Sequence, residues 1–283
     1  MRTRIDARHP RGRVGLLLAA ALIAGSAAAF AQRPTSPVFA PLLGDPKEPQ
    51  FFATYLWARS PRLASRLGSV GFGQTIGLLR GDSWQLAIAA GAFSQFNMQA
   101  TTNDLINTDY IVGLPLAYQR GASAARLRLY HQSSHLGDEY MARTHAQRVD
   151  LTFEAAELLV SNETAHWRVY GGGEYIFAHS PTDLKPGVLH GGVEYHQTRS
   201  LVRIGRLATG RLVAALDGRS VQDRNWQVGW SFVTGLELGD PTLAPGAGWR
   251  WSMLLKAYTG PSPYGEFYRD RVSSLGVGVG LTL

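Results

Sequence analysis

The chain has 283 residues, with 28 lysines and arginines against 21 aspartates and glutamates, and no cysteine. A chain without cysteine can hold neither a disulfide framework nor a thiolate metal site. Five of the arginines and one aspartate lie in residues 1–31, which leaves 23 basic and 20 acidic residues after them. The net charge of +7 therefore owes much to that first segment and does not favour nucleic-acid binding.

Residues 1–31 have the pattern of a secretory signal peptide. An arginine-rich start precedes an apolar run from Val14 to Ala24, and small residues follow, ending in Ala29-Phe30-Ala31. The apolar run is nearer the length of a signal peptide core than the roughly 20 residues of a membrane-spanning helix. The sequence therefore predicts export, with cleavage before Gln32.

Residues 32–50 are predicted to be a Pro-rich periplasmic leader that lies outside the sheet. They hold five prolines and show no periodicity, and a disordered linker is the alternative. From Phe51 onward the pattern becomes strand, turn and strand, with almost no helical periodicity. Because no apolar stretch after Ala31 is long enough for a spanning helix, a membrane location would require a β-barrel. We therefore predict one β-domain over residues 51–283.

About twelve strands are expected, and the better ones run about ten residues or more, which suits a tilted membrane crossing. Their apolar faces tend to begin or end in Trp, Tyr or Phe, as aromatic girdles do. The fold class is therefore all-β, an antiparallel transmembrane β-barrel in the bacterial outer membrane; a soluble periplasmic β-domain is the alternative. The expected strands lie near residues 51–59, 68–80, 84–97, 105–119, 123–136, 146–159, 165–178, 187–197, 208–219, 225–238, 247–259 and 272–283.

The links between these strands differ in length as they do in outer-membrane barrels. The second, fourth and sixth links are tight, and most of the others are longer, which matches short periplasmic turns and longer outer loops. The links near 198–207 and 239–246 are longer than this rule predicts, and the strand count near 198–210 stays open.

The stretch from Arg126 to Leu151 holds the candidate chemistry. Leu127, Leu129, His131, Ser133 and His135 share one strand face, because successive side chains point to opposite faces. In a membrane barrel the leucines face lipid and the intervening arginines face the lumen. The two histidines and the serine then lie on the lipid face, at the outer end of the strand.

The returning strand is expected over residues 146–159. Its alternation predicts Val149, Leu151 and Phe153 on the lipid face, and extending that face towards the loop reaches Gln147 and His145. The opposite parity predicts a lumen wall whose charges form a structural ion network rather than a conduction path. The residues expected in that network are Arg126, Arg128, Arg148, Asp150, Glu154, Arg168 and Glu174.

A serine is a poor nucleophile until a base takes its proton. His131 or His135, two residues away on the same face, could serve Ser133 in that way. Gln147, His145 or Glu139 could orient the imidazole.

The loop carboxylates Asp138 and Glu139 could hold Ca²⁺, a hard cation that takes oxygen ligands and polarises ester carbonyls. A site of this kind that faces lipid would attack lipid esters.

This arrangement resembles outer-membrane phospholipase A, a twelve-stranded barrel whose His-x-Ser pair faces the lipid and whose amide orienter lies on the next strand. The resemblance implies His131 as base, Ser133 as nucleophile and Gln147 in approximately the place of the asparagine. Residues 256–283 also resemble that family's ending, whereas its Ser-Asn-Gly is replaced here by Ser133-Ser134-His135. The His-x-Ser pair with a following Glu is also similar to lipid A deacylases.

A resemblance over most of the chain after residue 31 is to a family of uncharacterised bacterial outer-membrane proteins, a domain of unknown function. It rests on an H-x-S-S-H-x-G-D-E segment at residues 131–139 and an S-P-Y-G-x-F-Y segment at 262–268, and it implies no activity.

Two functions therefore stand side by side. One is a lipid-facing serine esterase, with Ser133 as nucleophile and His131 as base, acting on the acyl chains of phospholipid or lipid A. The other is a non-enzymatic barrel, structural or a narrow pore. The expected partners are phospholipid and lipopolysaccharide, with a second copy of the chain as a further candidate, and no nucleic acid.

Overall fold

A computed structural model describes residues 37–205, 208–240, 248 and 250–282. The predicted signal peptide and residues 32–36 lie outside the described residues. Twelve long strands run through the described part: β1 (Phe51–Arg59), β2 (Arg66–Arg80), β3 (Trp84–Asn97), β4 (Leu105–Arg120), β5 (Ser123–Leu136), β6 (Thr152–Glu163), β7 (Trp167–Ser180), β8 (Gly187–His196), β10 (Ala208–Val221), β11 (Gln227–Gly239), β12 (Arg250–Pro261) and β13 (Arg271–Thr282).

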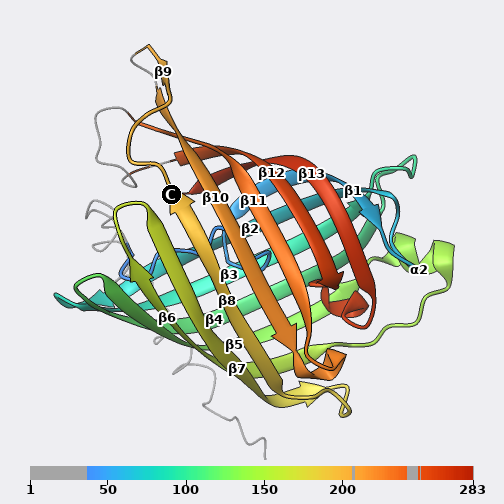
Figure 1. Ribbon diagram of the computed structural model, residues 1–283. Helices are drawn as coiled ribbons and strands as arrows, with labels where there is room; N and C mark the ends of the chain where they lie inside the picture. The colour runs from blue at the N-terminus through green and yellow to red at the C-terminus, as the bar shows by residue number, and fades with distance from the viewer. Residues whose placement is uncertain (1–36, 206–207, 241–247, 249, 283) are drawn as a thin grey trace, which may run out of the picture. The chain divides into compact units, whose positions relative to one another are not determined.

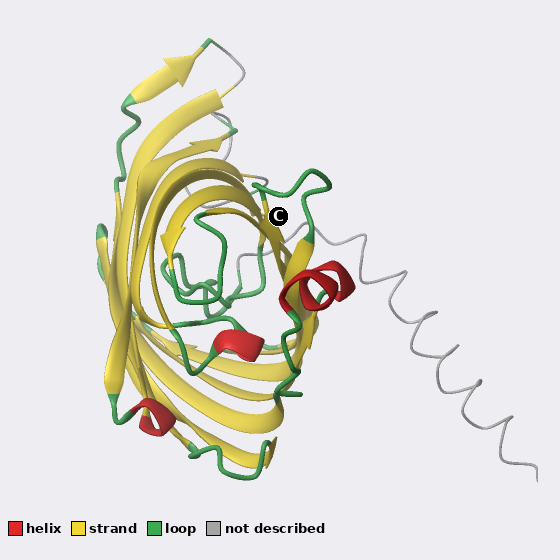
Figure 2. Cartoon of the chain, turned by 90° about the vertical axis from the view of Figure 1, so that its right-hand side faces the viewer, coloured by secondary structure: helices red, strands yellow, loops and turns green. Residues whose placement is uncertain are grey.

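These strands form one antiparallel sheet that closes on itself. Strand β1 pairs with both β2 and β13, and the pairing of β10 with β11 completes the ring (Figures 1 and 2). A short strand, β9 (Val202–Ile204), pairs with the first residues of β10, in the region where the sequence left the strand count open. The predicted antiparallel barrel of about 12 strands is confirmed. Within the described residues, no helix is long and apolar enough to cross a membrane.

The two ends of the barrel differ. Helix α2 (Asp138–Thr144) and the 3-10 helices η1 (Gln222–Arg224) and η2 (Gly265–Phe267) lie in links at one end, here called the loop end (Figure 1). The tight links after β2, β4 and β6 lie at the other end, here called the turn end, because antiparallel strands alternate in direction.

The outer face is apolar, as the alternation predicted. On β4, Tyr110, Val112, Leu114, Leu116 and Tyr118 are between 45% and 52% exposed, and the residues between them point inward or are small. The apolar outward face of a water-soluble sheet would be unfavourable in water. In a barrel of the outer-membrane type, the same face is solvated by lipid.

The lumen is occupied by residues 37–50, a location that the sequence did not predict. The segment forms no strand and runs inside the barrel (Figure 1), where Val38, Phe39 and Leu42 are buried. Arg126 of β5 donates two hydrogen bonds to Glu48, with Nη1 2.7 Å from Oε1. The Leu43 amide donates to Glu194 of β8 at 2.6 Å. The proline-rich composition is consistent with both locations, because it specifies only that the segment is not a strand.

An ion network lines the lumen behind this segment. Four of the residues expected there point inward: Arg126, Arg128, Arg168 and Glu174. The other three do not, because Arg148 and Asp150 lie exposed in a coil and Glu154 faces outward. Glu157, to which the sequence analysis assigned no role, lies between two arginines and is 1% exposed. The main pairs are Arg126–Glu157, Arg128–Glu157, Arg168–Glu194, Arg219–Glu174 and His190–Asp217.

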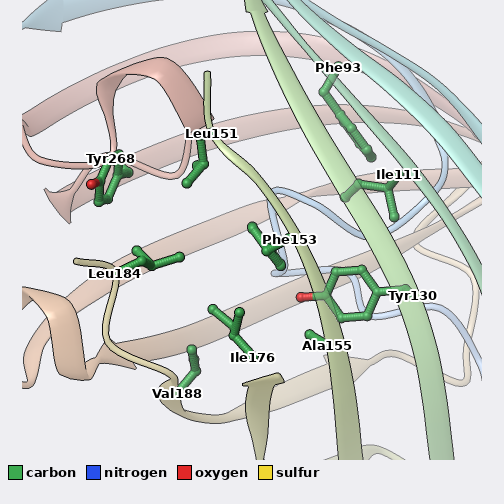
Figure 3. Close-up of a cluster of buried hydrophobic side chains, with 10 residues drawn as sticks. All are labelled: Phe93, Ile111, Tyr130, Leu151, Phe153, Ala155, Ile176, Leu184, Val188 and Tyr268. Carbon is green, nitrogen blue, oxygen red and sulfur yellow. The ribbon is translucent and has the colours of Figure 1, made fainter. Parts of the chain in front are cut away.

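The lumen near the loop end contains an apolar cluster beside buried polar groups such as Asp109 and Glu266. A cluster of buried side chains from β3 to β8 and from three links packs there, and it includes Leu151, Phe153 and Tyr268 (Figure 3). Together with residues 45–47, the link after β12 and charged side chains of the ion network such as Arg128 and Glu174, it borders a cavity of about 120 Å³. Apolar residues at this end can therefore face inward, which the simple rule of apolar outside and polar inside does not anticipate.

Strand β6 shows the consequence. It begins at Thr152 rather than near residue 146, and its outward residues are Thr152, Glu154, Leu158 and Val160. Leu151 and Phe153, expected on the lipid face, belong to the buried cluster instead. The predicted parity of this strand is therefore wrong, because it took the first apolar residues to face lipid.

Candidate functional site

The candidate nucleophile lies on the outer face of β5, close to the loop end. His131, Ser133 and His135 alternate with Gln132 and Ser134, which are buried inside. The predicted outward parity of these three residues agrees with the structure. They interrupt the apolar outer face with a polar patch that also holds Thr152 and Glu154 of the neighbouring strand.

Glu154 is directly opposite His131 in the β5–β6 register. His131 Nδ1 lies 3.0 Å from Glu154 Oε1, and both side chains are a little under half exposed. If Nδ1 carries the proton, it donates to the carboxylate and leaves Nε2 free to accept a proton, a tautomer inferred from the bonding. Ser133 pairs with Thr152 at the last rung of this ladder. A serine, a histidine and a carboxylate therefore lie together on one outward face.

The described residues contain no hydrogen bond between Ser133 and His131. Catalytic hydrogen bonds are often long without substrate and tighten when it binds. Two positions apart on one strand face, the side chains are within roughly 7 Å at their Cβ atoms, a gap that the imidazole can span.

The other proposed orienting groups lie elsewhere. Gln147 is exposed in the coil before β6, and His145 is the residue that ends α2, with φ 53°. Glu139 is exposed in the first turn of α2. None of these three side chains therefore occupies the place next to His131 that Glu154 fills.

One sequence signal could have identified Glu154. Leu151 and Phe153 occupy odd positions, whereas the exposed Leu158 and Val160, on either side of the buried Leu159, occupy even ones. The later pair is nearer the tight link to β7, where parity is better determined. Counting back from Val160 assigns Glu154 to the outer face.

The barrel wall behind Ser133 packs against the link between β12 and β13. Ser134, the inward neighbour of Ser133, packs against Gly265 of η2. The Gly265 amide donates to both carboxylate oxygens of Asp109, at 3.2 and 3.1 Å. Asp109 also accepts from Asn107 at 2.9 Å and pairs with Lys47 of the lumen segment. The two segments singled out in the sequence, 131–139 and 262–268, thus meet in space.

Gly265 leaves no room for a side chain. A Cβ at this position would overlap Ser134 Oγ and lie 2.5 Å from Ser134 Cβ and 2.9 Å from Asp109 Oδ1. We expect Gly265→Ala to lower the free energy of unfolding by about 1–3 kcal/mol through overpacking, measured by urea unfolding in lipid vesicles. Ser134→Gly should recover most of the loss in the double variant. Equal stability of Gly265→Ala and parent would contradict this packing.

Glu266 attaches the coil before β6 to the same link. Its Oε2 accepts a hydrogen bond from the Val149 amide at 2.8 Å. Burial raises the pKa of the Glu266 carboxyl, and the backbone amides of Val149 and Asp150 act in the opposite direction. The start of β6, and with it Glu154, is therefore positioned by the link between β12 and β13, which is far away in the sequence.

The proposed calcium ligands do not form a site in one chain. Asp138 and Glu139 are exposed in successive positions of α2. Among the residues that the structure describes, no group of three or more His, Asp or Glu side chains could hold a metal ion. Ca²⁺ takes six to eight oxygen ligands, whereas the groups around Ser133 are imidazoles, hydroxyls and one carboxylate already bonded to His131. The residues present do not fit calcium.

The barrel is similar to solved structures of outer-membrane phospholipases. With outer membrane phospholipase A from Escherichia coli it shares a TM-score of 0.56 and 14% identity, covering 84% of this chain and 93% of that one. With an active-site mutant of that enzyme at pH 6.1 the TM-score is 0.56 and the identity 14%, and the match covers 91% of this chain and 98% of that one. The Salmonella typhi outer membrane phospholipase dimer with bound calcium gives 0.55 and 14%, covering 84% and 94%. At this identity the likeness shows the fold alone.

A search of curated proteins gives no match to this sequence. A family model matches residues 17–282, nearly the whole chain, and its description is "Protein of unknown function (DUF1207)". The predicted membership in a family of unknown function, with the barrel fold of an outer-membrane phospholipase, is confirmed at this level. The chain belongs to the family of proteins of unknown function DUF1207.

Proposed function

We propose that this protein is an integral outer-membrane barrel that hydrolyses acyl esters of membrane lipid, with Ser133 as nucleophile, His131 as general base and Glu154 as the group that orients His131. The observation that carries the proposal is the 3.0 Å contact between His131 Nδ1 and Glu154 Oε1, beside an outward serine. A structural anchor at a membrane interface needs polar groups, but it does not need a serine, an imidazole and a carboxylate in this order.

The proposed reaction uses these three side chains. Ser133 Oγ attacks the ester carbonyl carbon while His131 Nε2 takes the serine proton, and Glu154 stabilises the imidazolium through Nδ1. Collapse of the tetrahedral intermediate breaks the ester bond, and His131 gives the proton to the leaving alkoxide, which departs as the alcohol. Water then hydrolyses the acyl-serine with His131 again as base. The products are a free fatty acid and a lipid with one acyl chain fewer.

The position of the site supports a lipid substrate. Leu127 and Leu129 precede His131 on the same outward face, and Val112 of β4 is the direct partner of His131. Acyl chains of phospholipid or of the lipid A part of lipopolysaccharide would lie against these side chains, and the ester groups of a membrane lipid lie at the level where apolar surface ends.

The lumen argues against a pore. Residues 37–50 fill its centre and are held to the wall by buried ion pairs and hydrogen bonds. The apolar cluster and the link that contains η2 occupy the loop end. A narrow conducting path would need the lumen segment to leave, and the chemistry proposed here takes place on the outside of the barrel.

The experiment is fatty-acid release from phospholipid and from lipopolysaccharide by folded protein in detergent. Ser133→Ala should lower the rate by roughly 10³-fold or more, because the nucleophile is lost. Ser134→Ala is the matched control and should stay within about threefold of the parent, since Ser134 points inward and its Oγ has no hydrogen-bond partner.

Two outcomes would count against the proposal. Loss of activity in Ser134→Ala but not in Ser133→Ala would contradict the assignment of the nucleophile. Absence of release from either lipid by correctly folded parent, with and without Ca²⁺, would leave the structural barrel as the better reading.

A further inference from the structure

The second histidine of the site, His135, has the same spacing to Ser133 as the first. Ser133 lies between His131 and His135 on one outward face, two residues from each. A strand rises about 3.3 Å per residue, so each imidazole starts at roughly the same distance from the serine hydroxyl. Both histidines can therefore reach an ester that reacts at Ser133, and their distance from Ser133 along the strand does not distinguish their roles.

The neighbouring strands make the two histidines different. The last strand pair of β5 and β6 is Ser133 with Thr152, and Glu154 faces His131. Beyond that pair the Ser134 amide donates to the Leu151 carbonyl at 2.9 Å, and the next residue, Asp150, lies in an exposed coil with φ 53°. On β4 the partner of His135 is Thr108, whose Oγ1 shares a hydrogen bond of 2.8 Å with Ser94 Oγ. Among the described residues no carboxylate forms an ion pair with His135.

His135 is instead held by an aromatic contact. Its ring centroid lies 5.9 Å from that of Tyr110, with 58° between the planes. Tyr110 is the direct β4 partner of Ser133, so its side chain lies on the same outward face beside the serine. The contact places a nitrogen donor next to Ser133 without a carboxylate to turn it into a strong base.

Ester hydrolysis needs such a donor. When Ser133 Oγ bonds to the carbonyl carbon, the carbonyl oxygen gains a negative charge, and hydrogen-bond donors or cations at that oxygen lower the barrier. The phospholipase dimer from Salmonella typhi holds calcium, whereas the residues around Ser133 in this chain do not fit that ion. The backbone amides of the strand are engaged in its ladder, which leaves side chains to supply the donor.

On the basis of the proposed function, we infer that His135 is a catalytic residue that donates an N–H hydrogen bond to the oxyanion, so that the reaction proceeds without calcium. The two histidines divide the work according to their neighbours: His131, with Glu154, moves the proton, and His135, without a carboxylate, keeps its proton and stabilises charge. No proton passes from His135 to the substrate, and the balance of the hydrolysis is unchanged.

The test measures kcat and KM for a short-chain phospholipid in excess EDTA and in Ca²⁺, with four proteins. They are the parent, His135→Ala, His135→Gln and His166→Ala. His166 is the matched control, because it is exposed at the turn end and its ring is stacked on Tyr195 at 6.1 Å. Folding of each variant is checked by circular dichroism and by its unfolding midpoint.

The parent should hydrolyse the lipid equally well in EDTA and in Ca²⁺. His135→Ala should lower kcat by roughly 10²- to 10³-fold, the usual effect of losing one oxyanion donor, with KM changed less than about threefold. His135→Gln retains an N–H donor and should recover about tenfold over the alanine variant. His166→Ala should match the parent.

The outcomes separate this inference from the function on which it rests. A folded parent that is inactive under both conditions overturns the hydrolase itself. An active parent that requires Ca²⁺, or an unchanged kcat in His135→Ala, overturns the role of His135 and leaves the hydrolase standing. If the residual activity of His135→Ala no longer rose with pH as the parent's activity does, His135 would be the general base. That result would also overturn the inference.

Discussion

Replacing His131 by alanine is expected to lower kcat for lipid ester hydrolysis by roughly 10²- to 10⁴-fold, the contribution usual for a general base. Glu154→Gln should cause a smaller loss, about tenfold to 10²-fold, because the amide keeps a contact to Nδ1 but no longer stabilises the imidazolium. The half-exposed position of this pair weakens the charge interaction and limits the effect. Rates at saturating lipid, compared among folded variants, measure both changes.

Gln147→Ala and Glu139→Gln are the matched controls for Glu154. Both residues were candidates for orienting the imidazole from the sequence, and both side chains are exposed away from the β5–β6 ladder. We expect each to stay within about twofold of the parent, as surface substitutions usually do. A large loss in Gln147→Ala with none in Glu154→Gln would mean that the coil before β6 reaches the site during catalysis, against the geometry described above.

Glu157→Ala is expected to give the largest loss of stability. The Glu157 carboxylate lies between Arg126 and Arg128, with Oε2 2.7 Å from Arg128 Nη2, and all three side chains are buried. Arg126 keeps Glu48 when Glu157 is lost, but Glu157 is the only ion-pair partner of Arg128 among the described residues. Breaking a buried pair from one side costs about 3–5 kcal/mol, so the free energy of unfolding in lipid vesicles should fall by that amount.

A double variant distinguishes charge from volume at this position. Arg128→Met with Glu157→Leu removes both charges and keeps similar bulk, so it should recover most of the stability lost in Glu157→Ala. Glu163→Gln, an exposed carboxylate at the turn end of the same strand, should change stability by less than about 0.5 kcal/mol. A double variant as unstable as Glu157→Ala would mean that packing, rather than the unpaired guanidinium, carries the effect.

The strand boundaries could be predicted from the local sequence pattern, because the alternation within a barrel strand depends on neighbouring residues only. Alternation with period two and the turn residues between runs placed β1, β3 and β5 at the bounds that the structure has. The tight links fixed the register of their hairpins, and the outward parity of His131 and Ser133 followed from the two leucines before them. Such inferences need only neighbours within one hairpin.

The region between β5 and β6 was harder because its link is long. Residues 138–144 form α2, and a coil follows it, so no tight turn transmits the register from β5 to β6. The rule that apolar residues face lipid then selected the wrong parity, since Leu151 and Phe153 pack into the apolar cluster inside the lumen. Because of this wrong parity, Glu154 was predicted to face the lumen, and Gln147 was predicted to lie on the outer face as a possible partner of His131.

The sequence by itself determined the class of the fold, an approximate count of twelve strands and the outward face that carries Ser133 with its two histidines, because these depend on periodicity and composition within single strands. Only the tertiary structure decided that residues 37–50 fill the lumen, that Gly265 packs behind Ser134, and that Glu154 is the carboxylate beside His131. Each of these depends on contacts between segments far apart in the chain, such as Arg126 with Glu48 at 2.7 Å. Their register is set by closure of the barrel and by packing inside it, and local alternation does not encode either one.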